Sequence, residues 1–364
     1  MHIQIVNGLK EFEEFREQWD SLNSRGEDHC VFSSFDWVKN IVETLCGNSN
    51  FICILIFNAN KKILIGGLPL LIRKKNVLGK NRRVLQHATS VCTDFSVVLC
   101  CQNSEVCQRE VIKKITESIL SMSDQWDILH FDNLSTGSAA ANLFRHYLSR
   151  RFQLSSYVNV TNPITNLEIN FEDSKNIRDL KRREKKLRTE FENVEFVING
   201  EVNNTIYEAM LNNHRSTFPG IGFNNKENQV FFLKIIDRVS ENIEFSYLTL
   251  NGKFAAGHFG FKNSSKIFYY VPTYDKGFSK FGVGQLLLWK MIQEYKSKGF
   301  NEFDLLRGDE SYKDYWLTDV RSNFSVILLS NNNNRFFDKL YTNLWVTAKC
   351  TPFIKKAVKK YLRK

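Results

Sequence analysis

The sequence predicts an α/β (α+β) protein with mixed, mostly antiparallel sheets, divided into two domains and a C-terminal helical tail. Its 364 residues exceed what one hydrophobic core usually organises. Short apolar runs of strand length alternate with amphipathic stretches of helical period in both halves. Asn251-Gly252 separates two such runs, which is typical of a β-hairpin. We expect the boundaries to give domains 1–162 and 163–332 and a basic tail 333–364.

The first domain opens with an amphipathic helix at 9–19, and Ser34 is placed to cap a second helix. Apolar runs at 51–57 and 62–71 flank a short polar turn and predict a hairpin. The remaining elements are helices at 35–45, 107–122 and 138–151 and a strand at 127–131.

The second domain begins with a strongly basic helix at 173–191 that contains KRREKKLR. We interpret its charges either as a solvated face or as a phosphate-contacting face. Three strands should then run antiparallel, and the pattern changes to a helix near Gly284 with the apolar stripe Leu287, Met291 and Tyr295. The further elements are helices at 205–213 and 227–239 and strands at 244–250, 254–261, 267–271 and 302–306.

The chain carries a net charge of +11, which favours an anionic partner such as coenzyme A, a nucleotide sugar, RNA or an acidic membrane face. Nucleic acid is not expected, because no aromatic residues interleave the charges of the basic helix. The 8 cysteines show no paired C-x-x-C spacing, so we expect reduced core residues and no metal site. No apolar run is long enough to span a bilayer and no signal pattern is seen at the N-terminus, which predicts a cytoplasmic protein. The basic amphipathic tail allows at most a peripheral membrane contact.

The most informative stretch is a strand, a glycine-bearing turn and a helix. The aromatic strand 267–271 ends at Pro272, and Gly277, Gly282 and Gly284 lie before or at the start of the helix. The first N–H groups of a helix lack internal partners, and glycine lets the backbone approach a phosphate closely. This arrangement predicts an anion site.

Two segments carry a resemblance to a known family: YYVPTYDKGFSKFGVGQLLL and FDLLRGDESYKDYW. They resemble the GNAT acyltransferase branch named after cellulose-biosynthesis acyltransferases, which is related to Fem-type aminoacyl transferases and to N-acyltransferases of nucleotide-linked amino sugars. Ser279 stands where the usual GNAT turn begins with Arg or Gln. The first half, with VFSSFDWVKNI, FICILIF, ILIGGLPLLI and VCTDFSVVL, also resembles this branch. The resemblance implies tandem GNAT-like domains, of which the first is degenerate.

The resemblance also implies a donor site for acyl-CoA, a substrate and not a permanently bound cofactor. It places the pyrophosphate at the glycine turn and an oxyanion-binding N–H near Val271, where the strands splay. In GNAT enzymes a tyrosine in the region of Tyr312 often protonates the leaving thiolate. The implied donor-binding residues are Val271, Lys280, Phe281, Gly282, Val283 and Gly284.

Direct acyl transfer to an amine needs a base, a donor to the thioester oxygen and a proton for the thiolate. His258 is the first candidate base; a tight turn at Asn263-Ser264 would place it opposite Tyr269. The alternative is a buried histidine bonded to a tyrosine. Asp275 follows the aromatic strand and either orients the amine or caps a loop.

The acceptor is expected near polar residues at the ends of the predicted elements. Arg307, Asp309 and Glu310 follow a strand at its carboxyl end, where α/β sheets present ligand-binding groups. An internal ion pair is the alternative for these three. His214 and Arg215 face either the acceptor or a structural partner, and Tyr269 lies beside the donor.

We therefore predict a CoA-dependent N-acyltransferase whose acceptor is the amine of a nucleotide-linked (dTDP or UDP) amino deoxy sugar destined for surface polysaccharide. Two alternatives stay open. One is an aminoacyl-tRNA-dependent transferase of the Fem type, whose binding would depend strongly on salt. The other is a non-catalytic scaffold of a polysaccharide-synthesis complex, which would bind no acyl-CoA.

Overall fold

The computed structural model describes residues 1–330 except 27, 47–50, 78–79, 103–106, 151–153, 172–173, 218–224 and 309, and beyond them only 340, 343 and 346–347. The chain forms two compact units, which divide after Val160 and again after Val320. The first division lies two residues before the expected boundary at 162. The second lies inside strand β13 (Asp319–Leu329), so most of this strand returns to unit 1, whereas we expected it in the second domain. The tail 333–364 lies almost entirely outside the described residues.

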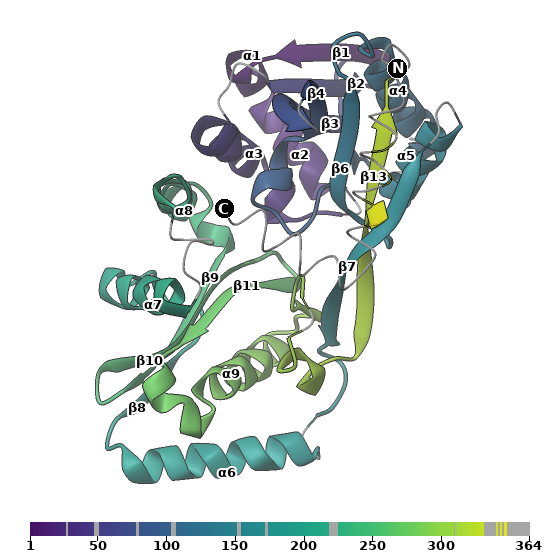
Figure 1. The fold of residues 1–364 in the computed structure, drawn as a ribbon. Helices are drawn as coiled ribbons and strands as arrows, with labels where there is room; N and C mark the ends of the chain where they lie inside the picture. Colours follow the sequence, from purple (N-terminus) through teal and green to yellow (C-terminus); the bar gives the residue numbers. More distant parts are fainter. Residues whose placement is uncertain are drawn as a thin grey trace. The chain divides into compact units, whose positions relative to one another are not determined.

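Unit 1 contains a sheet with the strand order β1-β2-β3-β4-β6-β13 (Figure 1). Neighbouring strands are antiparallel except β4 and β6, which are parallel. The predicted hairpin is confirmed by the pairing of β2 with β3. The strands are β1 (His2–Asn7), β2 (Phe51–Phe57), β3 (Leu64–Val77), β4 (Lys80–His87) and β6 (Ile128–Ser135), and β5 (Leu99–Cys100) pairs with β3.

Helices cover both faces of this sheet. A Cβ atom on Gly66 would collide with Val111 of α4, and one on Gly67 would lie 2.6 Å from the Trp19 ring of α2. Because successive residues of a strand face opposite sides, α2 and α4 pack on opposite faces, and both need glycine beneath them. Ser34 caps α3 as predicted, since its Oγ accepts the Trp37 N–H. The helices are α1 (Leu9–Glu13), α2 (Arg16–Ser24), α3 (Phe35–Ile41), α4 (Gln108–Ser121) and α5 (Ala139–Ser149).

Unit 2 contains a sheet with the order β7-β12-β11-β10-β9-β8, in which β11 and β12 run parallel. The hairpin between β9 and β10 is confirmed: Asn251 and Gly252 have φ of 49° and 76°, as a type I′ turn requires. The three antiparallel strands expected before the glycine turn are also confirmed. The strands are β7 (Ser155–Asn166), β8 (Val194–Val197), β9 (Ile243–Leu250), β10 (Lys253–Lys262), β11 (Lys266–Tyr274) and β12 (Glu302–Asp304).

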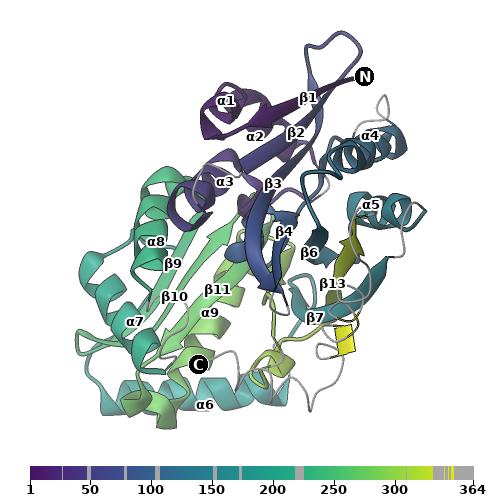
Figure 2. The same ribbon diagram turned by 45° about the horizontal axis from the view of Figure 1, so that its top comes forward.

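Helices also lie on both faces of the unit 2 sheet (Figure 2). Helices α7 (Asn204–Thr217) and α8 (Lys226–Arg238) cover one face, where Tyr207 and Phe232 contact the ring of Phe259. Helices α9 (Val283–Ser297) and α6 (Lys175–Glu190) cover the other, α6 lying against α9. The candidate site therefore lies on a sheet whose two faces are closed by different helices.

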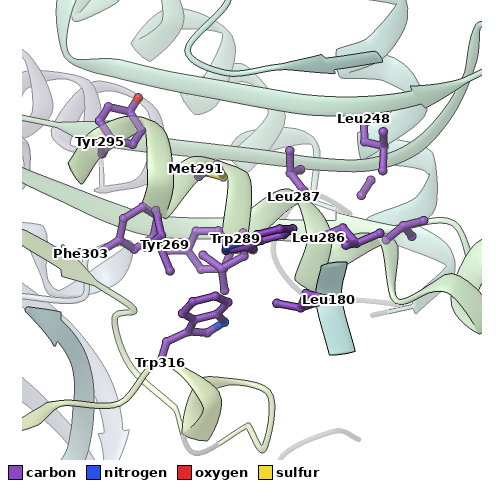
Figure 3. Packing of buried hydrophobic residues seen from close by; sticks show 14 of the residues in the cluster. Leu180, Leu248, Tyr269, Leu286, Leu287, Trp289, Met291, Tyr295, Phe303 and Trp316 are labelled. Carbon is purple, nitrogen blue, oxygen red and sulfur yellow. The ribbon is translucent and has the colours of Figure 1, made fainter. Parts of the chain in front are cut away.

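A large apolar core lies beneath α9 in unit 2. Figure 3 shows Leu287, Met291 and Tyr295 of α9 in one buried cluster with Leu248, Tyr269 and Phe303 of the sheet, and Leu287 lies near Leu248. The predicted stripe of α9 is buried, as expected for an amphipathic helix. Each fully buried large apolar side chain contributes about 1.5–3 kcal/mol. This burial fixes the position of the first turn of α9.

Candidate active site

Strands β11 and β12 pair only briefly and then separate. They are paired from Lys266 and Glu302 to Phe268 and Asp304, where β12 ends. Strand β11 continues to Tyr274, whereas the chain after β12 turns away through Leu306, whose φ is 57°. A parallel pair that opens in this way exposes one edge of β11 in the interior of the sheet. The predicted splay is therefore present.

The backbone of β11 shows which residues face this open edge. Asp275 N–H donates to Ala255 O of β10 at 2.9 Å. Because backbone groups alternate between the two edges of a strand, Val271 and Thr273 also face β10, and Pro272 and Tyr274 face the opening. Val271 N–H thus belongs to the β10 ladder and is not directed into the separation, where we had expected it to bind an oxyanion.

The turn after β11 leads directly into α9. Asp275 Oδ1 accepts the Gly277 N–H at 2.8 Å and begins a short 3₁₀ segment, Lys276–Phe281. Gly282 follows with φ of 67°, a left-handed conformation that favours glycine. The first α-helical bond is donated by Leu286 N–H to Gly282 O at 3.0 Å. The three preceding N–H groups, those of residues 283–285, therefore have no partner within the helix and suit an anion.

Helix α6 brings a cation to this turn. A Cβ atom on Gly282 would lie 2.7 Å from Arg183 Nη1, so the guanidinium lies directly beside the glycine. Asp179 holds Arg183 from one side, because its Oδ2 accepts Arg183 Nε–H at 2.6 Å. Hydrogen bonds from Arg183 and then Arg182 lower the pKa of Asp179. Arg183 belongs to the segment KRREKKLR, for which a phosphate-contacting face was one of the two interpretations. No local pattern connects α6 with the turn, so the sequence alone did not indicate which of these residues lies beside Gly282.

Lys280 and Phe281 occupy the last turn of the 3₁₀ segment. Lys280 forms an ion pair with Glu190 of α6 at 3.2 Å, and its ammonium lies 4.6 Å from the centroid of the Phe281 ring. Phe281 and Val283 are buried, so they anchor the turn to the core and do not present side chains to a ligand. A Cβ atom on Gly284 would lie 3.5 Å from the nearest atom of the Tyr274 ring, an ordinary van der Waals contact.

The loop after β12 is fixed to the first turn of α9 by Gln285, a residue that the sequence analysis did not identify. Gln285 Nε2 donates to the carbonyl of Tyr312 at 3.2 Å, and Gln285 Oε1 accepts Trp316 Nε1–H at 3.0 Å. The Tyr312 ring lies 6.5 Å from the ring of Tyr269. Burial raises the pKa of Tyr312, with a smaller contribution from Glu310, so its phenol keeps its proton.

Lys313 stabilises the same loop from inside. Its buried ammonium donates to Leu306 O at 3.3 Å and to Arg307 O at 2.9 Å, and it pairs with Glu310 at 2.9 Å. Glu310 is therefore part of an internal ion pair, one of the two interpretations of this segment. Arg307 is exposed, and Asp309 lies outside the described residues.

His258 lies on the face of β10 that α9 covers, and the expected pairing with Tyr269 is wrong. Asn263 N–H donates to Lys266 O at 3.0 Å, so the turn lies one residue later than predicted, and a bulge in β11 shifts the register again. His258 consequently pairs with Pro272. Its ring nevertheless stacks on that of Tyr269, with centroids 4.3 Å apart. His258 is fully buried, and both ring nitrogens are hydrogen-bonded.

His214 and Arg215 lie near the C-terminal end of α7, on the opposite face of the sheet. Burial lowers the pKa of His214. Arg215 Nη1 donates to Asn212 Oδ1 at 3.2 Å. The structure thus brings Tyr269, Tyr312 and the glycine turn together on the α9 face and does not bring His214 and Arg215 to them.

Within the described part of the chain, no group of three or more His, Cys, Asp or Glu side chains is arranged to hold a metal ion. Over the same residues, no helix has both the length and the apolar content needed to cross a bilayer.

Residues 174–314 match the family model described as "Acetyltransferase (GNAT) domain". These residues contain α6, the separated strands, the glycine turn and Tyr312. This segment is a GNAT acetyltransferase domain. The protein is thus an N-acyltransferase, and a GNAT acetyltransferase takes its acyl group from acetyl-CoA as a donor substrate. No curated protein matches the chain.

Solved structures share the fold over both units at low sequence identity. FemX is 10% identical at a TM-score of 0.58, over 89% of this chain and 97% of that one. A protein of unknown function from Bacteroides thetaiotaomicron is also 10% identical, at a TM-score of 0.56 over 86% and 97%. The C-terminal domain of a putative lysylphosphatidylglycerol synthetase from Agrobacterium fabrum is 8% identical at a TM-score of 0.54, over 92% of this chain and 96% of that one. These likenesses show that the chain shares its fold with these structures over both units.

Proposed function

We propose that the GNAT domain transfers an acyl group from acyl-CoA to the amine of a nucleotide-linked (dTDP or UDP) amino deoxy sugar, in the cytoplasm, for surface polysaccharide synthesis. The observation that carries the donor half is the opening between β11 and β12 beside the first turn of α9. The acceptor half rests on the resemblance of two sequence segments and on the net charge of +11.

The donor pyrophosphate would lie at the turn formed by Gly282, Val283 and Gly284. The N–H groups that precede the first helical bond and the Arg183 guanidinium supply its hydrogen-bond donors. Lys280 adds positive charge at the same turn. The acyl end would then run along the open edge of β11, where Tyr274 presents an N–H and Pro272 does not.

Transfer proceeds by direct attack, without a covalent enzyme intermediate. The amine nitrogen forms a bond to the thioester carbon, the carbon–sulfur bond breaks, the amine releases a proton to a base, and the thiolate takes one from Tyr312. Asp275 is the base or orienting group in this proposal, because its carboxylate follows β11 directly and accepts one N–H. His258 is not used as the base, since its Nε2 lone pair already accepts the Tyr270 N–H.

The acceptor would bind across the opening from the donor. Arg307, Asp309 and Glu310 follow β12 and are the acceptor-binding residues in this proposal. The exposed guanidinium of Arg307 suits a diphosphate. His214 and Arg215 lie on the α7 face and are not given this role, and the Tyr269 ring lies beside Tyr312.

The alternative is an aminoacyl-tRNA-dependent transferase of the Fem type. Its specific support is the fold shared with FemX over most of both chains. The scaffold alternative is not carried further, because the GNAT domain makes the protein an enzyme.

Calorimetric titration with coenzyme A and acetyl-CoA, each with and without dTDP- or UDP-linked amino sugars, tests this proposal. We expect saturable CoA binding that one amino sugar strengthens. CoA binding without an effect of any amino sugar would contradict the acceptor. Absence of CoA binding at low salt, together with salt-dependent binding of aminoacyl-tRNA, would favour the Fem-type alternative.

A further inference from the structure

A buried glutamate–histidine pair lies beneath the active site and has no part in the proposed proton transfers. Glu244 of β9 and His258 of β10 are both fully buried. His258 Nδ1 contacts Glu244 Oε2, and His258 Nε2 accepts the Tyr270 N–H at 3.0 Å. Because Nε2 is an acceptor, the hydrogen-bond network assigns the proton to Nδ1, which donates to the carboxylate.

The Tyr270 N–H needs this acceptor because β11 bulges there. The ladder pairs Phe261 with Phe268 and then Phe259 with Val271, so β11 has one residue more than β10 in this interval. Bulged residues lose their regular ladder partner, and a buried N–H without an acceptor is costly. His258 supplies the missing acceptor from the face of the sheet.

The sequence leaves space for this arrangement at one position. A Cβ atom on Gly260 would collide with His258 Cε1 and with Phe268 O. The space above Gly260 is therefore filled by the His258 ring. The bulge also begins directly after Phe268, the last residue of β11 that pairs with β12. The histidine thus acts where the two strands separate.

The same ring determines where Tyr269 lies. The His258 and Tyr269 rings stack with an interplanar angle of 12°, and Tyr269 lies edge-on to Tyr312. Glu244 is held in turn by Ser246 and by Tyr295 Oη, which lies 3.2 Å from Glu244 Oε1. An apolar pair would fill this space with less desolvation, but it would leave the Tyr270 N–H without an acceptor.

We propose that Glu244 and His258 are positioning residues of the acyl transfer, which hold the β11 bulge and the Tyr269 ring at the opening between β11 and β12. This inference rests on the proposed function, because it assigns the acyl end of the donor to that opening. It predicts an effect on the reaction step that is separable from binding of the CoA moiety at the glycine turn.

The test compares His258→Phe with Tyr295→Phe. The first keeps a ring over Gly260 but cannot accept the Tyr270 N–H. The second removes another hydrogen bond to the same Glu244 and leaves the hydrogen bonds of β11 in place. We expect His258→Phe to lower kcat about 100-fold. Its Kd for coenzyme A should stay within about threefold of wild type, since the glycine turn is intact. Tyr295→Phe should lower the melting temperature and keep kcat.

Glu244→Gln is the conservative variant, because the amide oxygen still accepts Nδ1–H, and it should retain most of kcat. If His258→Phe does not fold, Gly260→Ala makes the same test by displacing the ring while every buried polar group remains. Unchanged kcat in the variant that folds would overturn the inference, as would equal losses of kcat in His258→Phe and Tyr295→Phe. Wild-type protein that neither binds coenzyme A nor transfers an acyl group would instead remove the proposed function, and the inference with it.

Discussion

Each unit contains a parallel strand pair that opens, and the two units use the opening differently. In unit 1, β4 and β6 pair only through Val84 with Ile128 and Leu85 with Leu129. The chain then folds back after His87, the last residue of β4, whose Nε2 lies 3.0 Å from Val97 O. In unit 2, β11 continues along the opening and enters the glycine turn.

The difference shows that an opened strand pair becomes a site only when the neighbouring segments leave it open. Unit 1 closes it with internal hydrogen bonds, such as the one that the Thr93 hydroxyl donates to the backbone carbonyl of Thr89 at 2.7 Å. Its helix α4 starts after Cys107 in an extended conformation with φ of −73°. Both helices begin without a side-chain cap, but only the start of α9 has a left-handed glycine with Arg183 beside it. We therefore expect donor chemistry in unit 2 alone.

The largest effect is expected from Gly284→Trp. An indole in the first turn of α9 would occupy the pyrophosphate position, so CoA binding should weaken more than about 100-fold while the fold persists. Cys107→Trp, an exposed position at the start of α4 in unit 1, is the matched control and should bind CoA as wild type does. Calorimetric titration of both variants with coenzyme A measures the two affinities. The assignment of the donor site to unit 2 fails if the two variants behave alike.

Tyr312→Phe should lower kcat about 100-fold with little change in CoA affinity, since a positioned general acid contributes about 10²–10⁴-fold. Tyr315→Phe, in the same loop but 46% exposed, is the control and should be near wild type. Steady-state kinetics with the acceptor that calorimetry selects makes the measurement. Equal rates in the two variants would remove Tyr312 from the proposed chemistry.

The segment of unit 1 that follows β4 should lose stability in acid through protonation of His87. Burial lowers the pKa of His87 from 6.5 to about 4. The unfolded chain therefore takes up a proton at a higher pH than the folded one. The contribution of neutral His87 to the free energy of unfolding is complete above pH 6.5 and is lost as the pH falls toward about 4. The loss amounts to about 2 kcal/mol at pH 5. Denaturant unfolding of wild type and His87→Gln between pH 7 and 4 measures this loss. Equal slopes of the free energy of unfolding against pH in the two proteins would contradict this prediction.

The smallest effect is expected from Arg183→Ala, which should weaken CoA binding about tenfold, the loss of one charge-assisted hydrogen bond. Arg182→Ala is matched to it, because both arginines bind Asp179 at 2.6 Å and only Arg183 lies beside Gly282. The difference in CoA affinity between the two variants should shrink at high salt. If Arg182→Ala weakens binding as much, the net charge of α6 and not the position of Arg183 is responsible.

The sequence by itself determined the local elements and the kind of site. Asn251-Gly252 has few alternatives to a type I′ turn, the stripe of α9 has the helical period, and the order of strand, glycine turn and helix is local. The tertiary structure alone decided which residues meet there. Arg183 and Glu244 reach the site through packing between distant segments, and Gln285 meets the loop after β12 in the same way. A turn one residue later and one bulge together set the register of His258, whose ring nitrogens are both bonded. Strand register and helix packing depend on contacts far apart in the chain, and no local pattern of residues encodes them.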